Sequence, residues 1–574
     1  MSRFGMHLSR PLGLAAALLM AAGLAACEGD TGPAGPVGPE GPRGEPGQSG
    51  AIDQSLSAVD KAFVGVGGKA AVDALDSFTI ESKGNRLILS EGRSAGDSSN
   101  DVSTFDLTVN YDVAGDKLRL DYTDRTFFFP FAGSRAYSEI IAGNLGYVEG
   151  VDNMFFPPPA DGDPQPQAAM TSDRVAAIRN EVGLLNPQLL LKAISADGSI
   201  ASESGFAILD GSVHELVQVD DPVAPITLFV NAATGQISKL ETVTSDPLLR
   251  DVSLEVFFLD WRGEAGAVRF PYSVFIAVDG ELVHAETRES VTVNGAIDAT
   301  LLAIPASLDP APAFVQADAD RGARHPQYLL QFASIGIRAE GLQNQVVAVP
   351  LDNADAAQAS VFHLTGAVHH SLAIKQTSGL VIVEAPLYPE RGEAILDWAE
   401  TQFPNTPVTH VISTHHHVDH AGGLRAFVAA GATVVLGAES EGFFSDIFRA
   451  PSTVIPDALE GTPTAAKLDT VRIGESLTID DANFPVVAHH ISSEHADDML
   501  MIQVDSTTGD KYLFTSDIFS PGNPANFQVG NGPSETLDAI NTLGLSVDVI
   551  VGGHGAPGGG PLSELENLVN PPLQ

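Results

Sequence analysis

The chain has 574 residues, too many for one hydrophobic core, so we expect two or more folded units. Hydrophobic residues make up 44% of the chain and charged residues 18%, which excludes long intrinsic disorder. The 30 Lys and Arg residues against 73 Asp and Glu residues give a net charge of −43, which repels phosphate groups and excludes nucleic acid as a partner.

The first 26 residues have the pattern of a lipoprotein signal peptide. Arg3 and Arg10 precede an uncharged apolar run from Leu12 to Ala26, which is too short to favour a permanent membrane span. The run ends in Leu-Ala-Ala-Cys27, which resembles the bacterial lipobox, and Cys27 is the only cysteine of the chain. We therefore expect lipidation of Cys27 on an exported cell-envelope protein, on the periplasmic or outer-membrane face. An ordinary signal peptide with an incidental cysteine is the alternative.

Residues 27–52 follow with a collagen-like repeat. Glycine occupies every third position from Gly29 to Gly50, and prolines fill many sites between. Only glycine fits at the axis of a collagen triple helix, but about eight triplets are few for an independent one. The segment predicts an extended tether that holds the protein off the membrane, with trimerisation through this segment as the alternative.

Residues 53–344 show repeated alternation of apolar and polar side chains, which is typical of half-buried strands. Helix-like patterns interrupt them at Asp173–Val182 and Pro187–Ala193. We predict a β-rich α+β domain built on a curved antiparallel sheet. The pattern is similar to that of lipoprotein-carrier domains, in which a half-barrel wraps around a helix. The residues of this domain indicate no function.

A cluster of histidines follows a β-branched apolar run that begins at Val408. Imidazole nitrogens and a carboxylate oxygen at the end of a strand are ligands that suit Zn²⁺. The pattern His-x-His-x-Asp-His fits in only one register, as His415, His417, Asp419 and His420. With this motif the chain resembles the metallo-β-lactamase superfamily.

The resemblance covers residues 345–574 and implies a four-layered αββα fold, whose opening strand is Leu380–Val383. It also implies further ligands downstream, and His495, Asp517 and His554 each follow a strand-like run. The ligand sets that it implies are His415, His417 and His495 for one divalent metal ion, Asp419, His420 and His554 for a second, and Asp517 as the bridge. Zinc is the expected metal.

Several residues refine this comparison. An aspartate at the bridging position resembles glyoxalase II and lactonases, whereas one large class of true β-lactamases has a cysteine ligand that this domain lacks. Glu384 and Glu494 stand where Asp and Gly are commoner in the family. The pairs His369-His370 and His489-His490 are expected near the mouth of the site, and we favour supporting or packing roles over substrate contact.

The resemblance implies a hydrolase that cleaves a carbonyl ester, thioester, lactone or amide of a small-molecule substrate, with Asp419 orienting the attacking hydroxide. One alternative is another activity on the same scaffold: a sulfatase, a phosphodiesterase or an oxygen-handling diiron protein. The second is a non-catalytic cell-envelope lipoprotein that binds a ligand and whose metal domain is structural. The sequence favours no particular substrate.

Overall fold

The computed structural model describes residues 52–571 except 128–132, 153–164, 171, 223, 264–265, 307–345, 367–368 and 524–527. The predicted signal peptide, the lipidated Cys27, the tether up to residue 51 and the predicted domain boundary at residues 344 and 345 lie outside the described residues. The described part belongs to one compact unit, Ala51–Gln574. None of its helices is both long and apolar enough to span a membrane.

The first half of the described chain forms one antiparallel sheet of 13 strands. The chain builds outward from β1 to β6, returns through helices, and builds inward from β7 to β13, which then pairs with β1. The strands are β1 (Ser77–Ile88), β2 (Asn100–Asp112), β3 (Lys117–Thr126), β4 (Gly133–Ala142), β5 (Leu145–Gly150), β6 (Gln167–Ala169), β7 (Ala201–Leu209), β8 (Ser212–Val219), β9 (Ile226–Asn231), β10 (Ile237–Asp246), β11 (Arg250–Arg262), β12 (Phe270–Val278) and β13 (Glu281–Val293).

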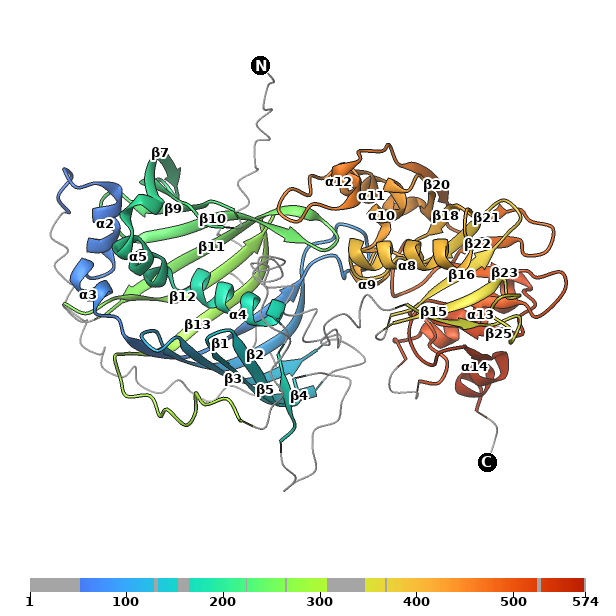
Figure 1. Cartoon of the computed structure of the whole chain (residues 1–574), viewed down its shortest axis with the longest axis horizontal. Helices are drawn as coiled ribbons and strands as arrows, with labels where there is room; N and C mark the ends of the chain where they lie inside the picture. The colour runs from blue at the N-terminus through green and yellow to red at the C-terminus, as the bar shows by residue number, and fades with distance from the viewer. Residues whose placement is uncertain are drawn as a thin grey trace, which may run out of the picture. The chain divides into compact units, whose positions relative to one another are not determined.

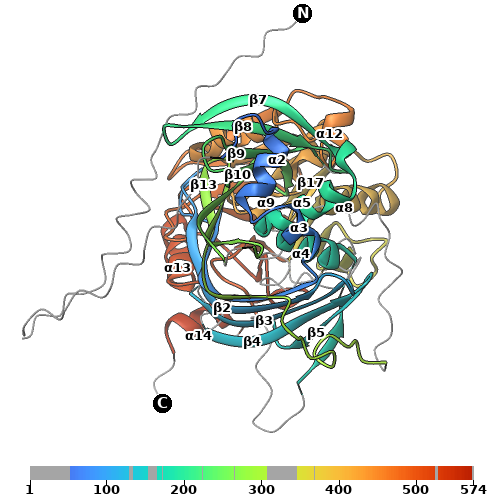
Figure 2. The same ribbon diagram turned by 90° about the vertical axis from the view of Figure 1, so that its left-hand side faces the viewer.

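This sheet curves around its helices (Figure 2). The helices are α2 (Ala58–Gly65), α3 (Lys69–Asp73), α4 (Ser172–Leu185) and α5 (Pro187–Ala196), with a short 3₁₀ turn η2 (Gly198–Ile200). Alternate residues of β3, such as Leu118 and Leu120, are buried in one core with Ile178 of α4 and Leu191 of α5. The alternation of the sequence thus buries one face of each strand, and the predicted curved antiparallel sheet is confirmed.

The second half contains two mixed sheets. In the first, antiparallel pairing from β14 to β17 changes to parallel pairing from β17 to β20. In the second, only β24 and β25 are parallel. The strands are β14 (Val347–Pro350), β15 (Val361–Thr365), β16 (Ser371–Lys375), β17 (Leu380–Val383), β18 (Val408–Ile412), β19 (Thr433–Gly437), β20 (Lys467–Val471), β21 (Ser476–Ile479), β22 (Val486–His490), β23 (Leu500–Val504), β24 (Tyr512–Phe514), β25 (Val549–Val551) and β26 (Gly560–Pro561).

These two sheets pack face to face, and helices cover both outer faces. Val381 of β17 and Phe514 of β24 meet in the core between the sheets, whereas Ile382 faces the helix side of the first sheet and Leu513 faces the helix side of the second. Figure 1 shows α8 and α14 on opposite sides of the strands. Apolar residues on both faces of a strand are what a four-layered arrangement requires, so the predicted αββα fold is confirmed.

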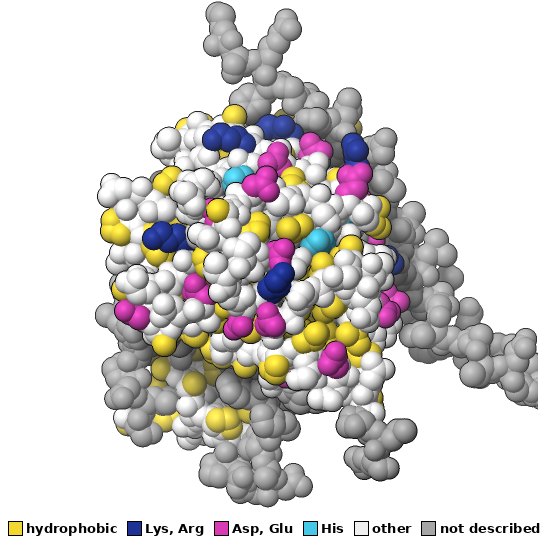
Figure 3. Space-filling model, turned by 90° about the vertical axis from the view of Figure 1, so that its right-hand side faces the viewer, with side chains coloured by type: hydrophobic (Ala, Val, Ile, Leu, Met, Phe, Trp, Pro, Cys, Tyr) yellow, Lys and Arg dark blue, Asp and Glu magenta, His cyan; other side chains and the backbone are white. Residues whose placement is uncertain are grey.

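The helices of these outer layers range in length from the four residues of α9 to the 14 residues of α8. The first sheet is covered by α8 (Pro389–Gln402), α9 (Val418–Ala421), α10 (Leu424–Ala429), α11 (Glu441–Ile447) and α12 (Ala458–Gly461), with the 3₁₀ turn η3 (Ala438–Ser440); the second is covered by α13 (Gly532–Leu543) and α14 (Leu562–Val569). On the face seen in Figure 3, acidic and basic side chains are interspersed among uncharged ones. On that face the acidic excess is therefore spread out, as expected if it serves solubility.

Candidate metal centre

Each predicted ligand lies just beyond the end of a strand. His415 and His417 follow β18, and His417 is the N-terminal cap of the one-turn helix α9 that carries Asp419 and His420. His495 lies in the loop between β22 and β23. The last two ligands, Asp517 and His554, each lie three residues beyond a strand, β24 and β25. Loops at strand ends can approach one another without disturbing the sheets, which is how this fold gathers the side chains.

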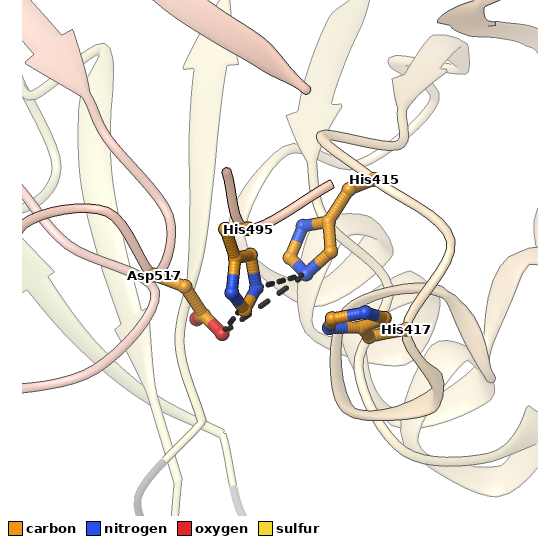
Figure 4. Close-up of side chains that lie close together, drawn as sticks. All are labelled: His415, His417, His495 and Asp517. Carbon is orange, nitrogen blue, oxygen red and sulfur yellow. Dashed lines mark hydrogen bonds and ion pairs between the residues drawn. The ribbon is translucent and has the colours of Figure 1, made fainter. Parts of the chain in front are cut away.

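The first group consists of His415, His417, His495 and Asp517, and Figure 4 shows the four side chains converging. Each offers one ligand atom within 4.8 Å of the others. Nε2 of His495 lies 3.2 Å from Nε2 of His415 and 3.1 Å from Oδ2 of Asp517. The ligand atoms of three imidazoles and one carboxylate therefore lie close enough together to bind one cation.

The second group consists of Asp419, His420, His554 and again Asp517. Oδ1 of Asp517 lies 2.7 Å from Nε2 of His420 and 3.1 Å from Nε2 of His554. Oδ2 of Asp419 lies 3.3 Å and 3.5 Å from the same two nitrogens. One oxygen of Asp517 thus faces each group, which is the arrangement of a carboxylate that bridges two cations.

The donor atoms fit a pair of divalent metal ions. Oδ1 of Asp419, Oδ1 of Asp517 and Nε2 of His420 are buried without a hydrogen bond of ordinary geometry, although the last two atoms are in close contact. Buried polar atoms normally have hydrogen-bond partners, and lone pairs that point to a common centre are the exception that a metal site explains. Mixed nitrogen and oxygen ligands suit Zn²⁺.

The protonation of the two groups differs. Burial holds the pKa of the His415 and His417 imidazoles well below the ordinary value, so both are neutral and ready to bind a cation. Burial acts in the same direction on His554, but Asp517 and Asp419 outweigh it and raise its pKa to about 10. Burial alone would raise the pKa of Asp419, yet the charge of His420 and contacts with neighbouring histidines hold it well below its usual value. A cation that binds the second group therefore replaces protons.

A buried polar network supports the second group. Oε2 of Glu384 lies 2.8 Å from Nδ1 of His420, and Oε1 of Glu384 accepts hydrogen bonds from the hydroxyls of Thr414 and Ser516. Glu384 and Ser516 have φ angles of 65° and 51°, in the left-handed region that side chains other than glycine rarely adopt. The unusual Glu384 is thus a partner of a predicted ligand.

The two histidine pairs of the sequence analysis and His416 lie in different places. Nε2 of His369 lies 3.4 Å from Oδ2 of Asp419, and Nε2 of His370 bonds to the carbonyl of Gly555 beside His554. His489 and His490 instead contact Ser476 and Glu439. His416 contacts Asp498 and belongs to neither group of four. Only the first pair therefore adjoins the centre.

Sequence reasoning missed two residues of the site, Glu91 and Gly92, in the loop between β1 and β2. The Gly92 carbonyl accepts a hydrogen bond of 2.9 Å from Nε2 of His417, which is 325 positions away. Oε2 of Glu91 lies 3.7 Å from Nδ1 of the same ring. Burial and the charges of Asp419 and Asp517 raise the pKa of Glu91 well above its usual value. No motif in the sequence marks this loop.

Part of the chain is similar to known proteins. Residues 365–554 match the family model described as the metallo-beta-lactamase superfamily. Similar solved structures include a B3 metallo-β-lactamase with an active-site glutamic acid, which is 16% identical with a TM-score of 0.29 over 40% of this chain and 95% of that one. A metallo-β-lactamase from Hirschia baltica is 19% identical with a TM-score of 0.29 over 40% and 99%. A subclass B3 enzyme from a soil metagenome library is 15% identical with a TM-score of 0.26 over 37% and 81%.

Proposed function

We propose that residues 365–554, a domain of the metallo-β-lactamase superfamily, use two divalent cations to hydrolyse a carbonyl ester, thioester, lactone or amide. The observation that carries this proposal is the bridging position of Asp517, with one oxygen toward each ligand group. His415, His417 and His495 would hold one cation, and Asp419, His420 and His554 the other. Zn²⁺ is the metal that these ligands suit.

A cation pair held there would supply Lewis-acid activation of water near neutral pH. Asp419 is ionised because the charge of His420 helps to hold its pKa low, so its carboxylate can accept a hydrogen bond from a water molecule and orient it. Burial keeps His369 neutral, with a pKa of about 4, and its Nε2 can donate to Oδ2 of Asp419. These two residues position the nucleophile without a serine or cysteine.

The exposure of the ligands indicates where substrate enters. The side chains of His415 and His420 have no exposed surface, whereas those of Asp419, His495 and His554 are 14%, 13% and 22% exposed. A scissile bond would therefore approach the centre from the side of these three residues. Because the other ligands are buried, a small molecule is the substrate that we propose.

The test combines metal analysis with a substrate panel. The purified protein should contain two cations per chain and hydrolyse at least one of an ester, a thioester, a lactone and an amide. Asp517→Asn should lose both a cation and activity, whereas the control Asp505→Asn, at an ion pair with Lys511 outside the centre, should lose neither. Full activity in chelated, metal-free protein would reject the proposal, and cleavage of only a phosphodiester or sulfate ester would move the enzyme to that class.

We propose in addition that the protein is exported and anchored to the cell envelope through acylated Cys27. The support is the signal peptide, the lipobox-like residues and the collagen-like tether of the sequence. In a bacterial host, an alkyne fatty acid should label the wild type and not Cys27→Ser. Light scattering with and without residues 28–51 would show whether the tether also forms trimers.

A further inference from the structure

The loop between β1 and β2, residues 89–99, connects strands of the 13-stranded sheet and also contacts the metal centre. The Gly92 carbonyl accepts hydrogen bonds from Nε2 of His417 at 2.9 Å and from Nε2 of His416 at 3.1 Å. A carbonyl that holds one ring nitrogen leaves the other available to a cation. Because Nε2 of His417 is engaged, Nδ1 is the nitrogen that is left to bind a cation.

The same loop is attached to the second ligand loop, which carries His495. Nε of Arg93 donates to Oδ1 of Asp497 at 2.8 Å, and the Ser94 hydroxyl donates to Oδ2 of Asp497 at 2.5 Å. The backbone N–H of Asp497 donates to the Arg93 carbonyl at 2.8 Å. His417 on one ligand loop and Asp497 on the other thus hold the loop in place.

Glu91 lies between these attachments, and its carboxylate is directed toward the centre. Oε1 accepts a hydrogen bond of 3.3 Å from the backbone N–H of Val418, and Oε2 lies 3.7 Å from Nδ1 of His417. Glu91, His417 and Asp419 each offer one ligand atom within 4.8 Å of the others. The carboxylate therefore lies beside the nitrogen that is left for a cation.

The charges around Glu91 also call for a cation. Its side chain is only 8% exposed and lies near Asp419 and Asp517, which are carboxylates as well. Within the described part of the chain, no lysine or arginine forms an ion pair with it. A buried carboxylate among others of its kind is costly unless a positive charge lies close by.

We propose that Glu91 is a further carboxylate ligand, supplied by the 13-stranded sheet domain, to the cation that His415, His417 and His495 hold. This inference rests on the proposed two-cation function, and it assigns a role to a domain whose sequence indicated none. The loop from Glu91 to Ser94 would complete the metal centre from outside the hydrolase domain.

The experiment compares the full-length wild type with Glu91→Gln, Glu91→Asp and the control Glu81→Gln, an exposed residue of β1. Cation affinity is measured by competition with a chromophoric chelator, and coordination by the absorption spectrum of the Co²⁺ form. Glu91→Gln should weaken one of the two cation sites at least tenfold and change the Co²⁺ spectrum. Glu91→Asp keeps a carboxylate, so its cation affinity should lie between those of the wild type and Glu91→Gln. The affinity and spectrum of Glu81→Gln should match those of the wild type.

Three results would overturn this inference. If Glu91→Gln keeps the affinity and spectrum of the wild type, Glu91 is not a ligand. If Glu91→Gln keeps the affinity and the spectrum of the wild type and its turnover rate increases, the loop blocks the site and substrate has to displace it. A wild type that binds two cations but cleaves no substrate would reject the proposed function alone, and the affinities would still decide the role of Glu91. A wild type that binds no cation would reject both.

Discussion

Glu384 and His420 contact each other over 2.8 Å, from Oε2 to Nδ1, and neither side chain has any exposed surface. With the proton on Nδ1, the Nε2 lone pair of His420 faces Asp517 and the second ligand group. The hydroxyls of Thr414 and Ser516 hold the other oxygen of Glu384. Glu384 therefore orients His420, which is the expected metal ligand, and is not one of the expected ligands itself.

Replacing Glu384 with glutamine should lower the affinity of the second cation by about 10- to 100-fold. The amide removes the negative charge that favours the required tautomer of His420. Chelator competition measures the affinity, with the exposed Glu400→Gln as the control. Equal affinities in both variants would show that the contact does not support metal binding.

His369→Phe should reduce kcat by about tenfold and leave the cation content at two. The substitution keeps an aromatic ring but removes the Nε2 that lies 3.4 Å from Oδ2 of Asp419. Steady-state kinetics and metal analysis of the same samples test this. A variant that loses a cation would show that His369 acts as a ligand instead.

The unfolding free energy of the metal-free protein should decrease as the pH is lowered, because of His363. Burial lowers the pKa of this histidine from 6.5 to about 4. Between those values the unfolded chain binds a proton that the folded chain does not, so acid favours unfolding. From pH 7 to 4.5, the wild type should lose about 2 kcal/mol more unfolding free energy than His363→Gln. Urea titrations at both pH values measure it, and parallel losses would contradict it.

Arg250→Met should destabilise the protein by about 3 kcal/mol. Arg250 begins β11, and its buried guanidinium bonds to the Ser452 hydroxyl at 3.0 Å and lies 3.6 Å from Asp457, both in the half of the chain that forms the two mixed sheets. Methionine would leave these polar groups buried without it. Urea unfolding measures the loss, and the exposed Arg262→Met is the control. Equal stability of the two variants would show that the Arg250 contacts contribute nothing net.

Much of the fold could be predicted from local patterns of apolar and polar residues. Alternation along strands such as β3 predicted the curved antiparallel sheet, and double-sided burial in β17 agrees with the four-layered fold. The pairing of β1 with β13 joins segments about 200 residues apart. No local pattern specifies such a contact, because it depends on how the whole sheet closes.

The sequence by itself determined which side chains resemble metal ligands, because His415, His417, Asp419 and His420 lie within six positions and the later ligands follow strand-like runs. Only the tertiary structure decided which way each atom points. Asp517 directs its two oxygens to different groups, and Glu91 reaches His417 across more than 300 positions. Coordination depends on lone pairs that meet within a few ångströms, and the packing of distant loops sets those distances.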